Sequence, residues 1–255
     1  MSARSELRAI ILAAGFGSRL GAHTRHHHKC ILEVGGLPIL TRTLETLVTA
    51  GIRKATLVVG HLGAQVRACA NAWRNHVDLR YVVNDRFATT GSGRSLALGL
   101  STAGRRDNVL VIEADVVFEY EALTPLLEAF EPQGTLVAPF GTNLTGSAVV
   151  CDANGRVRDW LHATHQGRGF RYARAYKTVN LTRLDQQATG ALLDHCVAAG
   201  DRAPLEYAMR ALVRTRLARI HAVDVGRARW CEVDTPEDLR LAEEMFGVGA
   251  LAGRA

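Results

Sequence analysis

The chain has little of what marks a secreted or membrane protein. Its 255 residues include five cysteines, and no two of them form a Cys-x-x-Cys pair. Their odd number and wide spacing argue against a disulfide framework and favour reduced thiols. No apolar run approaches the length of a membrane span, and the N-terminus lacks the pattern of a signal peptide. These absences predict a cytoplasmic protein without a membrane partner.

The net charge of the chain is modest, and it does not by itself indicate a nucleic-acid partner. There are 31 Lys and Arg against 25 Asp and Glu, which gives +6. The basic residues are scattered, and their densest group, within residues 168–177, is too sparse for a nucleic-acid-binding arm. We therefore expect no nucleic-acid partner, since a small anionic substrate accounts for the charge as well. Hydrophobic residues make up 47% of the chain, which is ordinary for a globular protein with a sizeable core.

The most informative segment is an apolar run that breaks into a glycine loop. Residues 9–14 read as a buried strand, and Gly15, Gly17 and Arg19 follow. Glycine accepts unusual φ and allows close approach, so backbone N–H groups in such a loop can face an anion. Lys29 adds a second fixed positive charge. The segment is neither a Walker A loop nor a dinucleotide fingerprint, because the required lysine and third glycine are missing. It suits a nucleoside triphosphate, with a plain strand-to-helix turn as the alternative.

Apolar runs and helical patterns alternate through the first half of the chain. We predict strands over residues 9–13, 55–59, 79–83 and 109–112, and helices over 39–50, 64–73 and 92–101. This order predicts parallel strands with right-handed crossovers and a ligand crevice at their carboxyl ends. Gly15, Asn84 and Asp115 each follow a strand end, so we expect them to converge at one edge of the sheet.

The second half predicts an antiparallel extension. After a helix over 121–130, short strands are expected over 135–138, 147–151, 157–160 and 176–180. Helices over 185–199 and 205–217, a strand over 219–224 and a helix capped by Thr235 complete the pattern. We predict a single domain over residues 1–246 that includes an extension over 134–182, and a flexible tail over 247–255.

Two acidic motifs suit a divalent cation. Asp115 ends the first, and Glu232 and Asp234 form the second, where the strand period of two places both carboxylates on one face. Mg2+ takes one or two carboxylates together with phosphate oxygens and waters. Each acid alone could be an ordinary loop or helix-proximal carboxylate, but beside the glycine loop they predict a magnesium site.

These motifs together resemble the nucleotidyltransferase family. The string Leu-Ala-Ala-Gly-x-Gly-x-Arg-Leu, a later Lys and Leu-Glu-Val-Gly-Gly-x-Pro-Ile-Leu are similar to the opening of MobA-like enzymes and sugar-nucleotide pyrophosphorylases. The segments 84–96 and 176–180 further resemble cytidylyltransferases for phosphocholine and aminoethylphosphonate. The resemblance spans residues 10 to about 246. It implies a Rossmann-like α/β fold, with a mixed, mainly parallel sheet flanked by helices and a small antiparallel extension.

The resemblance implies a role for each motif in an enzyme that uses CTP, Mg2+ and a small phosphate or phosphonate acceptor. Arg19 and Lys29 would bind the triphosphate, and Lys177 would hold the acceptor's anionic group within the extension. Asp115 and Asp234 would be metal ligands, with Glu232 as a ligand or an outer-shell partner. The other nucleotide-binding residues would be Leu12, Ala13, Ala14, Gly15, Gly17, Ser18, Asn84, Thr90, Gly91 and Ser92.

The sequence departs from the family pattern in two places. His28, in the run of histidines 26–28, stands where the family usually has proline, so the loop loses a fixed φ. The run reads as a polar loop, with metal binding as the alternative. A Trp-x-Asp-Gly-Thr element of the phosphocholine relatives is missing from residues 140–147, which argues against choline. Aromatic residues elsewhere form either another cage or ordinary core: Trp160, Phe170, Tyr172 and Tyr176.

Other functions stay open at this point. A sugar-1-phosphate nucleotidyltransferase that uses another nucleoside triphosphate would share these motifs, and so would a non-catalytic nucleotide-binding regulator. Lys177 could be a solvated lysine on an edge strand. The sequence does not identify the acceptor, and it leaves the formation of a homodimer open.

Overall fold

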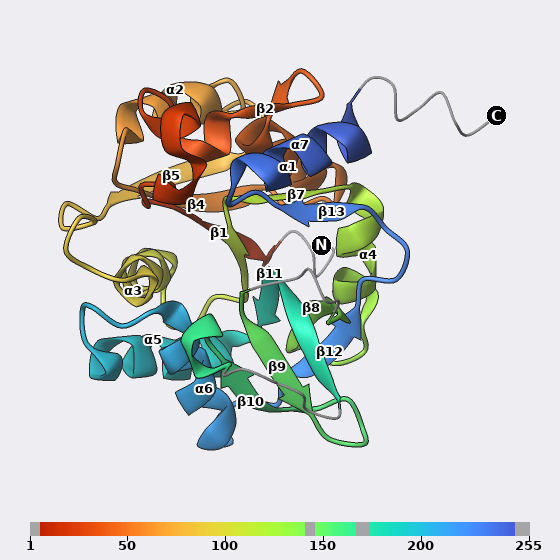
Figure 1. Ribbon diagram of the computed structural model, residues 1–255. Coiled ribbons are helices and arrows are strands. Elements are labelled where there is room, and N and C mark those ends of the chain that lie inside the picture. Colours follow the sequence, from red (N-terminus) through yellow and green to blue (C-terminus); the bar gives the residue numbers. More distant parts are fainter. Residues whose placement is uncertain (1–5, 141–145, 167–173, 248–255) are drawn as a thin grey trace.

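The computed structural model describes residues 6–140, 146–166 and 174–247, and its centre is a nine-stranded mixed sheet (Figure 1). The main path runs β10-β9-β11-β6-β1-β4-β5, and β8 pairs with both β11 and β12. Four strands are parallel, as the strand–helix alternation predicts: β1 (Arg8–Ala13), β4 (Lys54–Val59), β5 (Asp78–Val83) and β6 (Val109–Glu113).

The predicted antiparallel extension is present, but it is continuous with the parallel strands. Its strands are β8 (Gly134–Pro139), β9 (Ala148–Cys151), β10 (Val157–Leu161) and β11 (Ala175–Leu184). A further strand, β12 (His221–Asp224), runs parallel to β8 at the edge of the sheet. β11 runs antiparallel to β6, β8 and β9 and is twice the predicted length. Its register with β8 shifts between Thr178 and Thr182, so an irregularity lies inside one strand where the sequence predicted a strand end.

Helices cover both faces of the sheet (Figure 1). One face packs on α1 (Ile39–Thr49), α2 (Gly63–Asn71) and α4 (Tyr120–Glu128), and the other on α3 (Ser92–Ala103), α5 (Gln186–Ala199) and α6 (Leu205–Arg214). The period of two in β1 explains this, because Ala9 and Ile11 face the first group while Ile10 faces the second. The helix predicted over 205–217 ends earlier, since Arg216 adopts a left-handed φ of 60°.

Two small sheets and several short helices lie beside this core. β13 (Trp230–Glu232) pairs with β7 (Val116–Phe118), β2 (Glu33–Val34) pairs with β3 (Leu37–Pro38), and α7 (Pro236–Phe246) follows β13. Thr235 caps α7 in a reciprocal capping box with Asp238, as its sequence predicts. The short 3-10 helices are η2 (Ser18–Thr24), η3 (Lys29–Ile31) and η4 (Ala163–His165).

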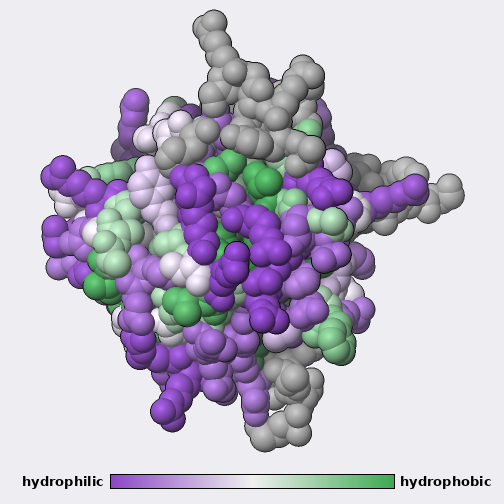
Figure 2. Space-filling view, turned by 90° about the horizontal axis from the view of Figure 1, so that it is seen from below, coloured by the Kyte–Doolittle hydropathy of each residue, from purple (hydrophilic) through white to green (hydrophobic). Residues whose placement is uncertain are grey.

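The cysteines, the helix lengths and the surface agree with an ordinary globular fold. All five cysteines are free. None of the helices in the described ranges is long and apolar enough to cross a membrane. The face seen in Figure 2 is largely hydrophilic, with apolar side chains in small groups among the polar ones. The predicted tail lies outside the described residues from residue 248 onward.

Candidate active site

The glycine loop joins β1 to η2 and lines two cavities that meet at Asp115. The first, of about 70 Å³, is lined by residues from the end of β1, the glycine loop, the start of η3 and the turn between β6 and β7: Leu12, Ala13, Gly15, Gly17, His28, Lys29, Cys30, Ala114 and Asp115. Gly17 has a φ of 63°, and a Cβ there would lie 3.0 Å from the Cβ of Lys29. The turn therefore needs glycine at this position. Ser18 begins η2 and lines neither cavity.

The second cavity, of about 180 Å³, reaches from the glycine loop to the start of α3. Its wall is formed by Leu12, Ala14, Gly15, Asn84, Phe87, Thr90, Gly91, Ser92, Ser95, Glu113 and Asp115. Asn84 is buried, and its Nδ2 donates to the hydroxyls of Thr90 at 3.0 Å and Ser95 at 3.1 Å. A Cβ at Gly91 would lie 2.3 Å from the carbonyl oxygen of Ala203. Asn84 and Gly91 thus shape the cavity as well as line it.

Three carboxylates meet where β7 and β13 pair. Glu232 lies opposite Val116, and the backbone N–H of Val233 donates to the carbonyl of Asp115 at 2.9 Å. This pairing brings together side chains more than a hundred residues apart. Asp115, Glu232 and Asp234 each offer an oxygen within 4.8 Å of the others. The three carboxylates predicted from the two acidic motifs therefore lie together in the structure.

Two cationic side chains, Lys29 and Arg19, form ion pairs with these carboxylates. Lys29 Nζ lies 2.8 Å from Asp115 Oδ2 and also pairs with Asp234 Oδ1, while Arg19 lies 2.7 Å from Asp234 Oδ2. Burial alone would lower the pKa of Lys29, but the charges of Asp115 and Asp234 outweigh it and raise that pKa. Burial likewise acts to raise the pKa of Asp234, and Lys29 and Arg19 together lower it. The two cations predicted to bind phosphate thus form ion pairs with the acids.

The residues present fit a hard divalent cation. Asp115 Oδ1 is buried and has no hydrogen-bond partner, which leaves an acceptor available in the middle of the cluster. Burial raises the pKa of Glu232, and the nearby Lys177 offsets only part of that effect. Carboxylate oxygens are the ligands that Mg2+ prefers.

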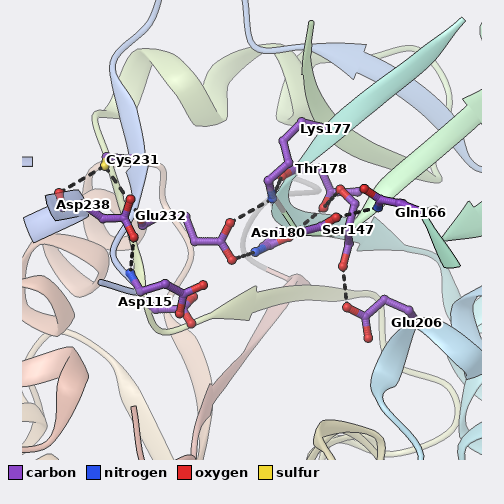
Figure 3. A network of polar contacts seen from close by, with 12 residues as sticks. Asp115, Ser147, Gln166, Lys177, Thr178, Asn180, Glu206, Cys231, Glu232 and Asp238 are labelled. Atoms are coloured by element: carbon purple, nitrogen blue, oxygen red, sulfur yellow. Dashed lines mark hydrogen bonds and ion pairs between the residues drawn. The ribbon is translucent and has the colours of Figure 1, made fainter. Parts of the chain in front are cut away.

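Lys177 is an interior residue of β11, because it is only 1% exposed. Its Nζ lies 2.9 Å from Glu232 Oε2 and donates to the carbonyl of Thr178 at 2.9 Å (Figure 3). This excludes the alternative of a solvated lysine on an edge strand. Lys177, Arg19, Glu232 and Asp234 share the wall of a third cavity, of about 490 Å³.

Asn180 is a site residue that sequence reasoning missed. It has a left-handed φ of 62°, its Nδ2 donates to Glu232 Oε1 at 3.0 Å, and its Oδ1 accepts from Thr178 Oγ1 at 2.7 Å (Figure 3). The sequence signal is an asparagine after a β-branched run, since asparagine tolerates the left-handed region. That residue produces the irregularity in β11 and holds Glu232 in place.

The two departures from the family pattern have different outcomes. His28 is buried and caps η3 by accepting from the N–H of Cys30 at 3.2 Å, and its Nε2 has no partner. Burial, with smaller effects of His61 and Lys29, lowers the pKa of His28 to about 4. Trp160 is 3% exposed and packs in the core against α6. Phe170, Tyr172 and residues 141–145 lie outside the described residues.

Several known proteins are similar to this chain in sequence and in fold. The CMP-5'-(3-aminopropyl)phosphonate synthase of Streptomyces rubellomurinus is 34% identical over 245 residues, which are 94% of this chain and 39% of that protein. The bifunctional IPC transferase and DIPP synthase of Rubrobacter xylanophilus is 30% identical over 259 residues, 98% of this chain and 54% of that protein. The chain thus spans about 39% and 54% of the length of these relatives.

The fold likeness covers nearly the whole chain. The inositol-1-phosphate CTP transferase from T. maritima superposes with a TM-score of 0.75 at 21% identity, over 94% of this chain and 95% of that one. Residues 9–181 match the model of the MobA-like NTP transferase domain. The resemblance and the fold class inferred from the sequence are both confirmed, and this chain belongs to the family of MobA-like NTP transferase domains.

Proposed function

We propose that this chain is a cytidylyltransferase that transfers CMP from CTP to a small phosphate or phosphonate monoester and releases pyrophosphate. The observation that carries the proposal is the convergence, at Asp115, of two loop-lined cavities and a carboxylate cluster bearing Lys29. The relative that forms CMP-5'-(3-aminopropyl)phosphonate supports a phosphonate acceptor. We place residues 1–246 in one cytoplasmic domain, with 134–182 on the acceptor side.

Each group of site residues would bind a different part of the two substrates. The glycine loop would bind the triphosphate with backbone N–H groups, and Lys29 and Arg19 would turn from the carboxylates to the phosphates and stabilise the departing pyrophosphate. The wall from Asn84 to Ser92 would hold the nucleoside. Lys177 would bind the acceptor's anion and reduce its repulsion from the α-phosphate. No general base is needed, because the acceptor is already ionised at neutral pH.

Asp115, Glu232 and Asp234 would hold Mg2+. When bound, this ion would supply positive charge against the negative charge that develops on the phosphate oxygens. The chain's own part is to keep the three carboxylates together through the β7–β13 pairing and the hydrogen bond from Asn180 to Glu232. Lys29 and Arg19 would neutralise the acids until the nucleotide and the ion bind.

The test measures pyrophosphate release with CTP, Mg2+ and a panel of acceptors: phosphocholine, 2-aminoethylphosphonate, hydroxyalkylphosphonates and sugar phosphates. We expect release with a phosphonate or phosphate monoester. Asp115→Asn and Asp234→Asn should each lower turnover by roughly 100-fold or more and leave the fold intact, because a preorganised charge partner is lost. Asp194→Asn, at an exposed position of α5, is the matched control. Near-normal turnover of either site variant at limiting Mg2+ would remove that residue from the metal site.

The alternative is a sugar-1-phosphate nucleotidyltransferase. A solved UDP-glucose pyrophosphorylase also shares the fold, with a TM-score of 0.75 at 14% identity. Melting temperatures measured with CTP, UTP, GTP and dTTP separate the two functions, because a bound nucleotide stabilises the folded state. The proposal expects the largest increase with CTP, and a larger increase with another nucleotide would favour the alternative.

A further inference from the structure

His28 lies between the glycine loop and η3, and the chain holds it there firmly. Its backbone N–H donates to Gln65 Oε1 at 3.0 Å, and Gln65 Nε2 donates to the carbonyl of His26 at 2.8 Å. Gln65 belongs to α2, which packs against η3. The side chain of His28 is only 3% exposed, whereas His26 and His27 are exposed. Of the three histidines in the run, His28 alone is thus built into the interior.

The contacts of the His28 ring determine where its proton lies. The backbone N–H of Cys30, which can only donate, donates to Nδ1 of His28 at 3.2 Å. An imidazole nitrogen that accepts carries no proton, so the ring is neutral and its proton is on Nε2. That Nε2 is buried and has no hydrogen-bond partner. Buried donors are normally satisfied, so this one indicates an acceptor that the chain itself does not supply.

The unused donor belongs to the wall of the glycine-loop cavity. His28 lines this cavity of about 70 Å³ together with Gly15, Lys29 and Asp115. The backbone of Gly15 faces the ring, but it lies outside hydrogen-bond geometry with Nε2. The cavity has several times the volume that one water needs. It therefore has room for a group with more than one oxygen.

Two occupants could accept from Nε2, and the charge beside it favours one of them. A water between His28 and the unpartnered Oδ1 of Asp115 would satisfy both atoms. An anion would instead accept from Nε2 and from the ammonium of Lys29, which is the next residue along the chain. Hydrogen bonds to an ionised acceptor are stronger than those to a neutral one, so the anion is the better partner for this pair of donors.

We propose that His28 is a ligand of the nucleotide's triphosphate, and that its Nε2–H donates to a phosphate oxygen beside Lys29. This inference rests on the proposed function, which places the triphosphate in the glycine loop. The neutral ring adds a directed hydrogen bond where Lys29 adds charge, and it does so without like-charge repulsion between the two side chains.

Two substitutions separate the two nitrogens of the ring. His28→Asn keeps an acceptor near the place of Nδ1 and has no atom at the place of Nε2. His28→Gln puts an amide N–H near the place of Nε2 and loses the cap. Calorimetry with Mg2+ near neutral pH measures Kd for CTP and for inorganic tripolyphosphate. We expect His28→Asn to weaken both affinities by about 10- to 100-fold, the range of a hydrogen bond to a charged group, and His28→Gln to keep most of them.

Melting temperatures of the same variants distinguish binding from structure. His28→Gln should be the less stable of the two, because it loses the cap of η3. Affinity and stability should therefore change in opposite order, whereas a purely structural role would make them fall together. The exposed His27→Asn is the matched control and should leave both unchanged.

Two results would overturn the inference. One is an unchanged affinity of His28→Asn for tripolyphosphate, which would assign Nε2 to the water beside Asp115. The other is the absence of tripolyphosphate binding by the unaltered chain. A failure of every acceptor to release pyrophosphate from CTP would contradict the proposed function instead, and the tripolyphosphate titrations would still decide the role of His28.

Discussion

Lys29 shares its single positive charge between two carboxylates of the candidate site. It is buried, and it pairs with both Asp115 and Asp234. Burial opposes the charge on Lys29, while the two acids favour it and raise its pKa. A lysine in this position stabilises the cluster of acids. In the proposed function it would turn to the phosphate oxygens once a cation is bound, and it would then couple the stability of the site to its occupancy.

Lys29→Met should lower the free energy of unfolding by about 1–3 kcal/mol without divalent cation, because two partly buried acids lose their partner. Added Mg2+ should restore part of that loss, and turnover with CTP should fall. Urea unfolding with and without Mg2+ measures the first effect, and pyrophosphate release measures the second. Lys54→Met, at the opposite end of the parallel strands, is the matched control. A variant with unchanged stability and unchanged kinetics for CTP would exclude Lys29 from the site.

At the scale of elements, the irregularity in β11 determines which side chains reach the carboxylates. Asn180 adopts a left-handed backbone inside an otherwise extended strand. Lys177 and Asn180 both bond to Glu232 as a result. A regular strand would alternate its side chains strictly, and residues three apart would point to opposite faces. The irregularity therefore brings both onto one carboxylate.

Asn180→Ala and Asn180→Gly distinguish backbone strain from the side-chain hydrogen bond. Both variants lose the bond to Glu232, but alanine alone suffers the left-handed φ, at a cost of about 1–2 kcal/mol. We expect the alanine variant to be less stable than the glycine variant by about that amount. In an ordinary strand position the order would be the reverse, because glycine is unfavourable in strands. Thermal unfolding of the pair measures this difference. Equal stabilities, or a more stable alanine variant, would contradict the role given to the backbone here.

At the scale of the whole molecule, β13 and β7 join the C-terminal part of the chain to the parallel sheet. Their pairing completes the site, and η3 packs beneath it with His28 buried. His28 faces the charges of His61, Lys29 and Asp115, and burial is the largest cause of its lowered pKa. A buried neutral histidine makes the stability of the whole fold depend on pH.

The direction of this pH dependence follows from the lowered pKa of His28, which is about 4 in the folded chain against an ordinary value of 6.5. Between pH 6.5 and 4 the unfolded chain binds a proton that the folded chain does not, so the unfolding free energy falls as pH falls. The contribution is about 3 kcal/mol in total, and it is fully present above the ordinary value. His28→Asn, which can still cap η3, should remove this part of the pH dependence.

Denaturant unfolding at pH 4, 5, 6 and 7 measures the difference between the two proteins. The exposed His76→Asn serves as the control and should follow the unaltered chain. If the difference between His28→Asn and the unaltered chain stays constant over this range, His28 does not titrate as its burial predicts.

Sequence patterns alone predict the fold class and the sheet edge at which the candidate site lies. Alternating strands and helices require parallel strands, and parallel strands bring Gly15, Asn84 and Asp115 to one edge. The two acidic motifs predicted the carboxylate cluster, but β13 ends at Glu232 and Asp234 follows in the connection to α7, so the strand period that was the predicted reason does not place Asp234. The predictive patterns are local ones of period and spacing, and they do not depend on how distant segments pack.

The packing of distant segments sets which groups are partners within the candidate site. Lys29 pairs with Asp234 because β13 packs on β7, and no local pattern specifies that pairing. Lys177 is buried because β11 lies between β6, β8 and β9, whereas its own string also suited an edge strand. Charges interact through space, so burial and partners follow from packing and not from order along the chain.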